Sequence, residues 1–205
     1  MSLPPRNPAP AQPSPTQVSR VEAAEFSPEE RTRLLRLAHD SILSSLEQRE
    51  IPLDPPTPHL AEPRGAFTTL HLFGELRGCV GYVFPTSPLY RTVAETARAA
   101  AFEDSRFWPV TRDEAPDLEI ELSILSRLQS ISSEEVEVGR HGLVVSFRGH
   151  RGLLLPQVPI EHGWDRVTFL EQTCRKAGLP LDAWRKGATL EAFTAEIFGD
   201  KALRR

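Results

Sequence analysis

The sequence predicts an α+β fold with a mostly antiparallel, barrel-like sheet flanked by helices. Two observations carry this prediction: strand patterns come mainly in hairpins, and strong helix-start signals separate those hairpins. The expected order is helix, hairpin, helix, strand, hairpins, helix and strand. A hairpin, helix and strand therefore occur twice, so we expect two sub-regions and an internal duplication.

Composition divides the chain into three parts. Residues 1–24 carry six prolines within their first 15 positions and no apolar run, which predicts a disordered proline-rich arm. Residues 25–200 form the expected domain, and residues 201–205 form a short tail. A chain of 205 residues is long enough to bury one substantial core.

The bulk numbers also limit the function classes. The formal net charge of −4 gives no global attraction to nucleic acid or to an anionic membrane. Two cysteines are too few for a disulfide scaffold or a cysteine-based zinc module, and no motif for a metal, a nucleotide or a cofactor occurs. We expect a cytoplasmic protein without metal or cofactor and without a membrane partner, and the net charge disfavours a nucleic-acid partner.

The first helix begins at a strong start signal. Ser27 is the expected N-cap, Pro28 occupies the first helical position, and Glu30 completes a capping box. Apolar residues at helical spacing follow and predict a core-facing stripe: Leu34, Leu35, Ala38, Ile42 and Leu46. Five prolines within residues 52–63 then predict a long extended connector.

A hairpin and a second helix come next. Residues 66–83 alternate between apolar and mixed positions and turn around Gly74, so the second strand carries the stretch ELRGCVGY. Ser87 as N-cap and Pro88 at the first helical position predict a helix over 87–104. Its many alanines indicate close packing against another element.

The second half of the chain repeats this pattern. Residues 117–126 alternate strictly and form the clearest strand, and residues 136–156 predict two or three antiparallel strands with glycine turns at 139–142 and 149–152. A helix lies within residues 161–180 and ends at Gly178. One last strand is expected within residues 189–200.

Cys79 is the first candidate for chemistry. Arg77 stands two residues earlier on the same strand, so both side chains are expected on one face, where the guanidinium favours the reactive thiolate. The alternative is a small buried side chain, with Gly78 and Gly81 allowing close backbone approach. Both interpretations stay open.

Other polar residues allow more than one interpretation. Glu119, Glu121 and Ser123 share one strand face, which predicts acid–base chemistry, a bound cation or only a solvated surface. Arg106 is expected to form a structural ion pair, either with Asp104 or with the acidic strand. Basic turns such as GRHG and RGHRG are explained by an anion site or by turn chemistry alone.

Several blocks together resemble the AMMECR domain family, the A protein of the AmmeMemoRadiSam systems. The resemblance covers about residues 26–200 and rests on blocks in the same order: RGAFTTLHLFGELRGCVGYVFPTSPL, AAAFEDSRFWPV, LEIELSILS, VGRHGLVVS, RGLLLPQVP and FLEQTCRKAGL. It implies an α+β fold of two sub-regions with a cleft between them. It also implies Memo-type and radical SAM proteins as partners, while the family's own reaction is not established.

The matching motif positions give the candidate site. We expect Cys79, Glu121 and His141 as catalytic residues, with Cys79 as nucleophile or redox thiol and the other two as proton carriers. The expected ligand-binding residues are Arg77, Gly78, Gly81, Asp104, Arg106, Ser123 and Gln157.

Three functions remain in competition. The first is an enzyme or pathway component acting on a small molecule or a modified side chain in a cleft around the LRGCVG strand. The second is a non-catalytic adaptor for the two partner types. The third, nucleotide or RNA binding, rests only on the arginine-rich turns.

Overall fold

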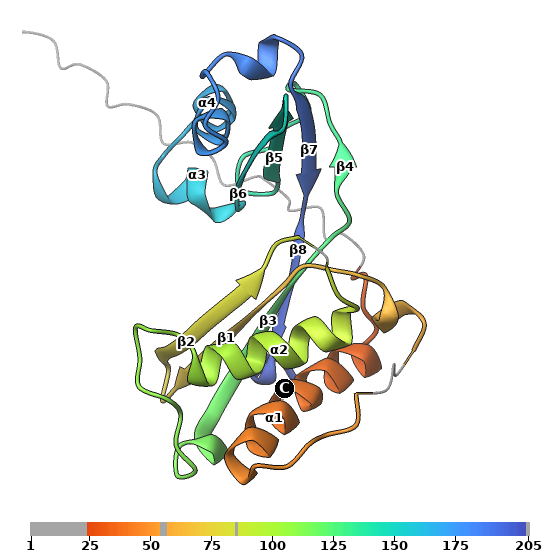
Figure 1. Ribbon diagram of the computed structural model, residues 1–205, viewed down its shortest axis with the longest axis vertical. Helices are drawn as coiled ribbons and strands as arrows, with labels where there is room; N and C mark the ends of the chain where they lie inside the picture. The colour runs from red at the N-terminus through yellow and green to blue at the C-terminus, as the bar shows by residue number, and fades with distance from the viewer. Residues whose placement is uncertain (1–23, 54–56, 85, 204–205) are drawn as a thin grey trace, which may run out of the picture.

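The computed structural model describes residues 24–53, 57–84 and 86–203. The fold is α+β, with two four-stranded antiparallel sheets in two lobes, which confirms the predicted class (Figure 1). The described residues form no closed barrel, because each sheet ends in two edge strands. The expected arm lies outside the described residues except for Ala24, and so do residues 204–205 of the tail.

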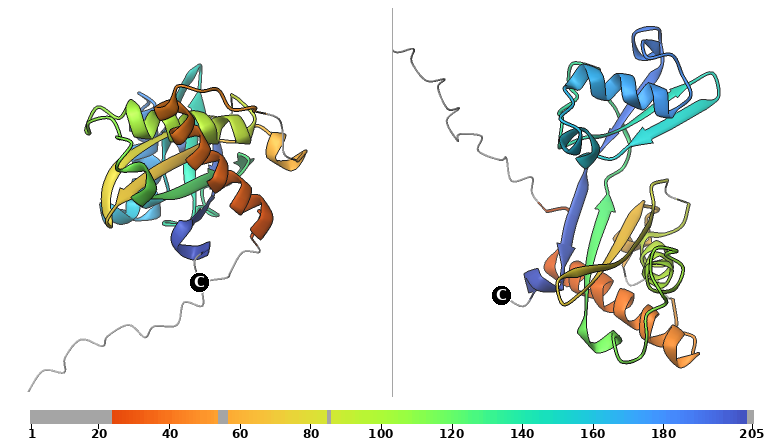
Figure 2. Two further views of the ribbon diagram at one scale, coloured as in Figure 1. Left: turned by 90° about the horizontal axis from the view of Figure 1, so that it is seen from below. Right: turned by 90° about the vertical axis from the view of Figure 1, so that its left-hand side faces the viewer.

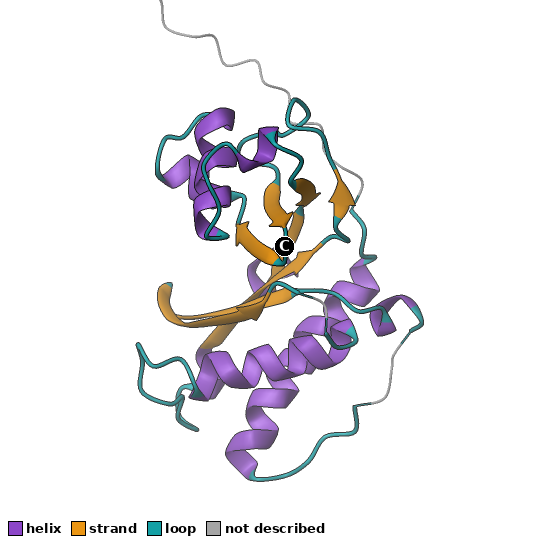
Figure 3. Ribbon diagram, turned by 45° about the horizontal axis from the view of Figure 1, so that its top comes forward, coloured by secondary structure: helices purple, strands orange, loops and turns teal. Residues whose placement is uncertain are grey.

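The first lobe is a sheet covered by helices on one face. Its strand order is β2 (Glu75–Tyr82), β1 (Ala66–Leu72), β3 (Leu118–Leu125) and β8 (Ala195–Gly199). Helices α1 (Pro28–Glu47) and α2 (Leu89–Phe102) both lie on the same side of this sheet, as Figure 3 shows. We call the opposite side the open face.

The second lobe repeats this plan on a smaller scale. Its strand order is β4 (Gln129–Ser130), β7 (Thr189–Phe193), β5 (Gly142–Phe147) and β6 (His150–Leu154). Helix α4 (Arg166–Lys176) packs on β6 and β5, and the short α3 (Gln157–Glu161) precedes it. Helix α5 (Asp200–Leu203) and three single turns, η1 (His59–Ala61), η2 (Ala115–Asp117) and η3 (Ala183–Arg185), complete the described fold.

The lobes exchange strands. In each lobe, a hairpin is followed by a helix and then by a strand that pairs with the first strand of the hairpin. The order is β1, β2, α2, β3 in the first lobe and β5, β6, α4, β7 in the second. After β3 the chain enters the second lobe as β4, and after β7 it returns as β8. Figure 2 shows this crossing between the lobes. The repeat seen in the sequence is therefore a repeat of topology; the duplication as such stays a prediction.

The two hairpins even turn in the same way. Phe73 and Gly74 have φ of +52° and +86°, and Arg148 and Gly149 have φ of +49° and +85°. Two successive residues with positive φ are typical of two-residue hairpin turns, whose backbone twist matches that of the two flanking strands.

The helix starts are confirmed in part. Ser27 accepts a hydrogen bond from the Glu30 N–H, and the Glu30 carboxylate accepts one from the Ser27 N–H, which confirms the capping box. Ser87 is not the second N-cap, because α2 begins only after Pro88 and has no side-chain cap. The expected helix at 161–180 starts later, with Asp165 as its N-cap.

One strand prediction is wrong and another is confirmed. The single strand expected at 189–200 is two strands, because the chain leaves one sheet after Phe193 and joins the other at Ala195. Of the two or three antiparallel strands expected over 136–156, the structure has two, β5 and β6, and the two-residue β4 was not expected. The split of the last strand arises from the exchange of strands, which local alternation does not encode.

The cores follow the lobes. The buried face of the first sheet packs on the apolar stripes of α1 and α2, which confirms the predicted stripe, and Cys174 is fully buried in the second core. A third cluster lies at the junction, where Leu125, Val144 and Phe193 contact the partly buried Phe67. The junction is therefore packed with apolar side chains rather than being a bare linker.

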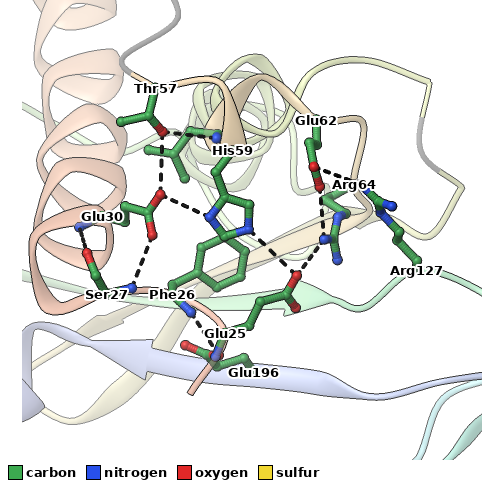
Figure 4. A network of polar contacts seen from close by, with 11 residues as sticks. Glu25, Phe26, Ser27, Glu30, Thr57, His59, Glu62, Arg64, Arg127 and Glu196 are labelled. Carbon is green, nitrogen blue, oxygen red and sulfur yellow. Dashed lines mark hydrogen bonds and ion pairs between the residues drawn. The ribbon is translucent and has the colours of Figure 1, made fainter. Parts of the chain in front are cut away.

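A polar network fastens the start of the described chain to the first lobe (Figure 4). His59 stacks on Phe26 with ring centroids 4.9 Å apart, and its Nδ1 lies 2.9 Å from a Glu30 carboxylate oxygen. The buried Arg64 guanidinium binds Glu62 at 3.1 Å and also binds Glu25. The network ties η1 to the beginning of α1.

The described residues contain neither a membrane-spanning helix nor a cluster of metal-ligating side chains. No helix there combines the length and apolarity needed to cross a bilayer. No group of three or more His, Cys, Asp or Glu side chains lies together there as metal ligands do.

Candidate functional site

The LRGCVG stretch lies on β2, an edge strand whose glycines let neighbours approach closely. A Cβ atom at Gly78 would lie 2.1 Å from the Ala100 carbonyl oxygen of α2. At Gly81 it would lie 2.1 Å from the Phe67 ring. Both glycines are thus needed for packing, whatever else they do.

The backbone of Cys79 is held on the free edge of β2 by two side chains. The Asp104 carboxylate accepts a hydrogen bond from the Cys79 N–H at 2.9 Å, and Arg106 donates one to the Cys79 carbonyl at 3.4 Å. Asp104 and Arg106 also form an ion pair at 2.7 Å. The structure thus confirms the expected pair and shows it capping an edge whose polar groups no strand covers.

The electrostatics keep this clamp charged. The hydrogen bonds from Arg106 hold the pKa of Asp104 far below its usual range, against the effect of burial. The Cys79 N–H adds to this effect by donating to the same carboxylate. Asp104 therefore stays ionised throughout the physiological range.

Arg77 belongs to a second anchor. Its guanidinium binds the Glu114 carboxylate at 2.9 and 3.1 Å and donates to the Trp108 carbonyl at 2.8 Å. The hydrogen bond from Arg77 lowers the pKa of Glu114 to about 2. The side chain that we expected to bind a ligand is thus engaged by the chain itself.

The thiol of Cys79 points to the open face. The Thr69 hydroxyl donates a hydrogen bond to the sulfur at 3.4 Å, and Cys79 is half-buried. Thr69 also pairs with Glu121 on its other side, so the register aligns Cys79, Thr69 and Glu121 in one row across three strands. Ser123 lies on the same face two residues along.

Two of the expected residues lie elsewhere. His141 precedes β5 in the second lobe and lines a cavity of about 510 Å³ with Glu137, whose N–H donates to its Nδ1 at 3.1 Å. Gln157 is exposed at the start of α3. The structure brings together Cys79, Glu121 and Ser123 on one face, while His141 and Gln157 belong to the other lobe.

Thr69 and Glu114 are the residues that the sequence did not indicate. The strand alternation already put Thr69 on the face opposite Thr68 and Leu70, but its partner depends on the hairpin register. Glu114 binds Arg77 across 37 residues of sequence, and no local pattern predicts such a pair.

The comparisons with known proteins agree with this architecture. The AMMECR1 family model matches residues 35–198. The chain belongs to the AMMECR1 family.

Three similar proteins come from three different organisms. A protein of Methanopyrus kandleri is 41% identical over 186 residues, covering 84% of this chain and 89% of its own. A protein of Methanocaldococcus jannaschii is 40% identical over 180 residues, with 83% and 90% covered. The crystal structure of an uncharacterized protein from Pyrococcus horikoshii is similar with a TM-score of 0.63 and 39% identity, covering 82% of this chain and 89% of that one.

Proposed function

We propose that this AMMECR1-family protein is an enzyme or pathway component whose ligand occupies the open face around Cys79. The ligand is a small molecule or a modified side chain. One observation carries the proposal: a half-exposed thiol receives a hydrogen bond from Thr69, while Asp104 and Arg106 fix its backbone from the opposite edge.

The geometry favours a positioned thiol over a merely small residue. A buried structural cysteine needs no hydroxyl donor, and the second cysteine, Cys174, is fully buried in a core. Cys79 instead sits on a strand that is clamped on both its N–H and its carbonyl. Rigid support of this kind holds a reacting group in place and lowers the entropic cost of binding.

The residues in the row across the sheet have different proposed roles. Cys79 is the nucleophile, and the Thr69 hydroxyl positions its sulfur by donating a hydrogen bond. Glu121 lies two strands away, about 10 Å at normal strand spacing, and carries protons at the far side of the ligand. Ser123 supplies a hydroxyl beside it.

The remaining motif residues support this row. Arg77, Asp104 and Arg106 are positioning residues, because their charged groups are paired with Glu114 or with one another. Gly78 and Gly81 bring α2 and Phe67 against the strand. His141 and Gln157 have no role in this reaction as proposed.

Memo-type and radical SAM proteins are the proposed partners of this activity. The basis is the family association alone. Such partners would supply or consume the ligand of the open face.

Native mass spectrometry tests the ligand site directly. The full chain is incubated with a small-molecule extract of its own cells, and bound species are weighed. We expect a bound species that is lost in Cys79→Ala and weakened in Glu121→Gln. Glu95→Gln, an exposed carboxylate on α2 away from the open face, is the matched control. Equal occupancy in Cys79→Ala and wild type would remove Cys79 from the site.

An adaptor is the second candidate function. It is favoured by Trp108, which is 89% exposed and whose carbonyl accepts a hydrogen bond from Arg77. Nucleotide or RNA binding has weaker support, since Arg151 in the basic turn is already paired with Glu191 and stacked on Phe84. Binding of a partner protein that is abolished in Trp108→Ala but unchanged in Cys79→Ala would favour the adaptor.

A further inference from the structure

The tip of the first lobe exposes three large apolar side chains. Phe73 lies in the β1–β2 turn and is 81% exposed, Leu76 follows on β2 at 42%, and Trp108 is 89% exposed. The Trp108 backbone lies beside β2, because Arg77, next to Leu76, donates to the Trp108 carbonyl, and Phe73 lies in the turn directly before β2. We call these residues the tip surface. We propose that the tip surface docks a basic segment of a partner protein, with cationic side chains over the Trp108 and Phe73 rings.

Phe73 occupies a backbone position that disfavours its side chain. Its φ of +52° is in the left-handed region, which is unfavourable for a residue with a Cβ. Asn, Asp or Gly is the usual choice at this position of a tight hairpin. Because the ring is 81% exposed, packing within the chain does not offset that cost. A strained, exposed aromatic side chain is typical of a residue kept for a function outside the fold.

Trp108 is displayed on an anchored loop. Arg77 binds its carbonyl at 2.8 Å, and two residues later Val110 is buried and donates its N–H to the Ala101 carbonyl at 2.8 Å. On the other flank, the Phe107 N–H donates to the Asp104 carbonyl. Since the loop is already ordered, docking on the indole needs little further ordering, as at the aromatic anchors of protein interfaces.

The charges around the tip surface specify the partner. Arg77 and Arg106 are neutralised by their ion pairs with Glu114 and Asp104. Two exposed carboxylates without an ion pair among the described residues lie close to the aromatic residues along the chain: Glu75 two residues after Phe73 and Asp113 five residues after Trp108. One further guanidinium, that of Arg112, donates to the Leu46 carbonyl of α1. Unpaired carboxylates and exposed aromatic faces both attract Lys and Arg, whereas an anionic lipid surface would be repelled.

Isothermal titration calorimetry of the full chain tests this proposal with two synthetic peptides. The peptides have equal length and the same apolar residues, and one carries arginines where the other carries glutamates. We expect the arginine peptide alone to bind, with an affinity that falls as salt is added. Trp108→Ala should weaken that affinity by about 10- to 100-fold, as for an aromatic hot spot.

Two further variants separate binding from folding. Phe73→Gly removes the ring, and glycine adopts a positive φ without strain. This variant should therefore stabilise the turn and still weaken the binding of the arginine peptide. Ile160→Ala, a similarly exposed apolar residue in the second lobe, should bind as wild type does. Cys79→Ala should also bind normally, because docking does not depend on the thiol.

Three results would overturn the proposal. One is equal binding of both peptides, which would remove the charge preference. Another is an unchanged affinity in both Trp108→Ala and Phe73→Gly. The third is self-association in sedimentation velocity that Trp108→Ala abolishes, because the tip surface would then be covered by a second copy of the chain.

Discussion

Asp104 binds the backbone N–H of Cys79 at 2.9 Å, although 25 residues separate the two along the chain. Two sequence blocks, ELRGCVGY and EDSRFWPV, are thereby joined at the free edge of the first sheet. The contact fixes the strand that carries the thiol, and it leaves the thiol itself on the opposite, open face. Several measurements follow from this arrangement.

Asp104→Asn should loosen the edge of β2. The amide keeps the shape of the carboxyl group but loses the charge-assisted bonds to Cys79 and Arg106, so we expect a loss of about 1–3 kcal/mol in the free energy of unfolding. Urea denaturation measures this loss, and hydrogen-exchange measurements should show faster exchange of the Cys79 amide hydrogen. Ser105→Ala, at an exposed neighbouring position, is the control. Unchanged protection of the Cys79 amide would contradict the clamp.

Glu114 should make the stability of the protein pH-dependent. Arg77 lowers the pKa of Glu114 from 4.5 to about 2 in the folded state. A carboxyl group whose pKa is depressed by folding stabilises the fold above its unfolded pKa, and this contribution is lost as pH falls from 4.5 towards 2. The difference in urea midpoint between wild type and Glu114→Gln should therefore be largest above pH 4.5 and shrink towards pH 2. Glu75→Gln, which removes a carboxylate without an ion pair among the described residues, controls for net charge.

Gly78→Ala should be far more damaging than Gly74→Ala. At Gly78 the new Cβ would meet the Ala100 carbonyl at 2.1 Å, and a backbone atom cannot move aside without displacing α2. We expect a loss of about 3 kcal/mol or more. At Gly74 the space is open and only the positive φ opposes alanine, which costs about 1 kcal/mol. Thermal unfolding of both variants checks the order, and equal losses would contradict the close packing of β2 on α2.

The two cysteines should react very differently with a thiol reagent. Cys79 is half-exposed, whereas Cys174 is fully buried and burial raises the pKa of its thiol. Iodoacetamide should therefore label Cys79 in the native chain and Cys174 only after unfolding. Peptide mass spectrometry distinguishes the sites. Labelling of Cys174 at the same rate in the native chain would show that the second core opens readily.

Much of the fold could be read from the sequence because its signals are local. The capping box at Ser27, the alternation of residues 118–125 and the glycine after α4 each depend on neighbours within one or two turns of chain. The prediction of a single strand at 189–200 was wrong because the two halves of this segment join different sheets. That choice is made by the partner strands, which lie far away in the sequence.

The site followed the same division. The sequence singled out Cys79 and Glu121, and it indicated the ion pair of Asp104 with Arg106 as one of two pairings for Arg106. It did not reveal that Arg77 forms an ion pair with Glu114, or that His141 lines a cavity in the other lobe. Residue type indicates which groups can react, but only long-range contacts show which of them are already paired.

By itself the sequence indicated most of the helices and strands, the family resemblance and the candidate side chains. The tertiary structure decided which way the thiol faces. From the turn, Leu72 pairs with Glu75 and His71 with Leu76, so a regular ladder would have put Cys79 opposite Thr68, on the helix-covered face. Arg77 is the extra residue of a bulge, and Cys79 pairs with Thr69 instead. A one-residue shift exchanges the two faces of a strand, and Glu114 and the Trp108 carbonyl hold that shift in place from a distant loop.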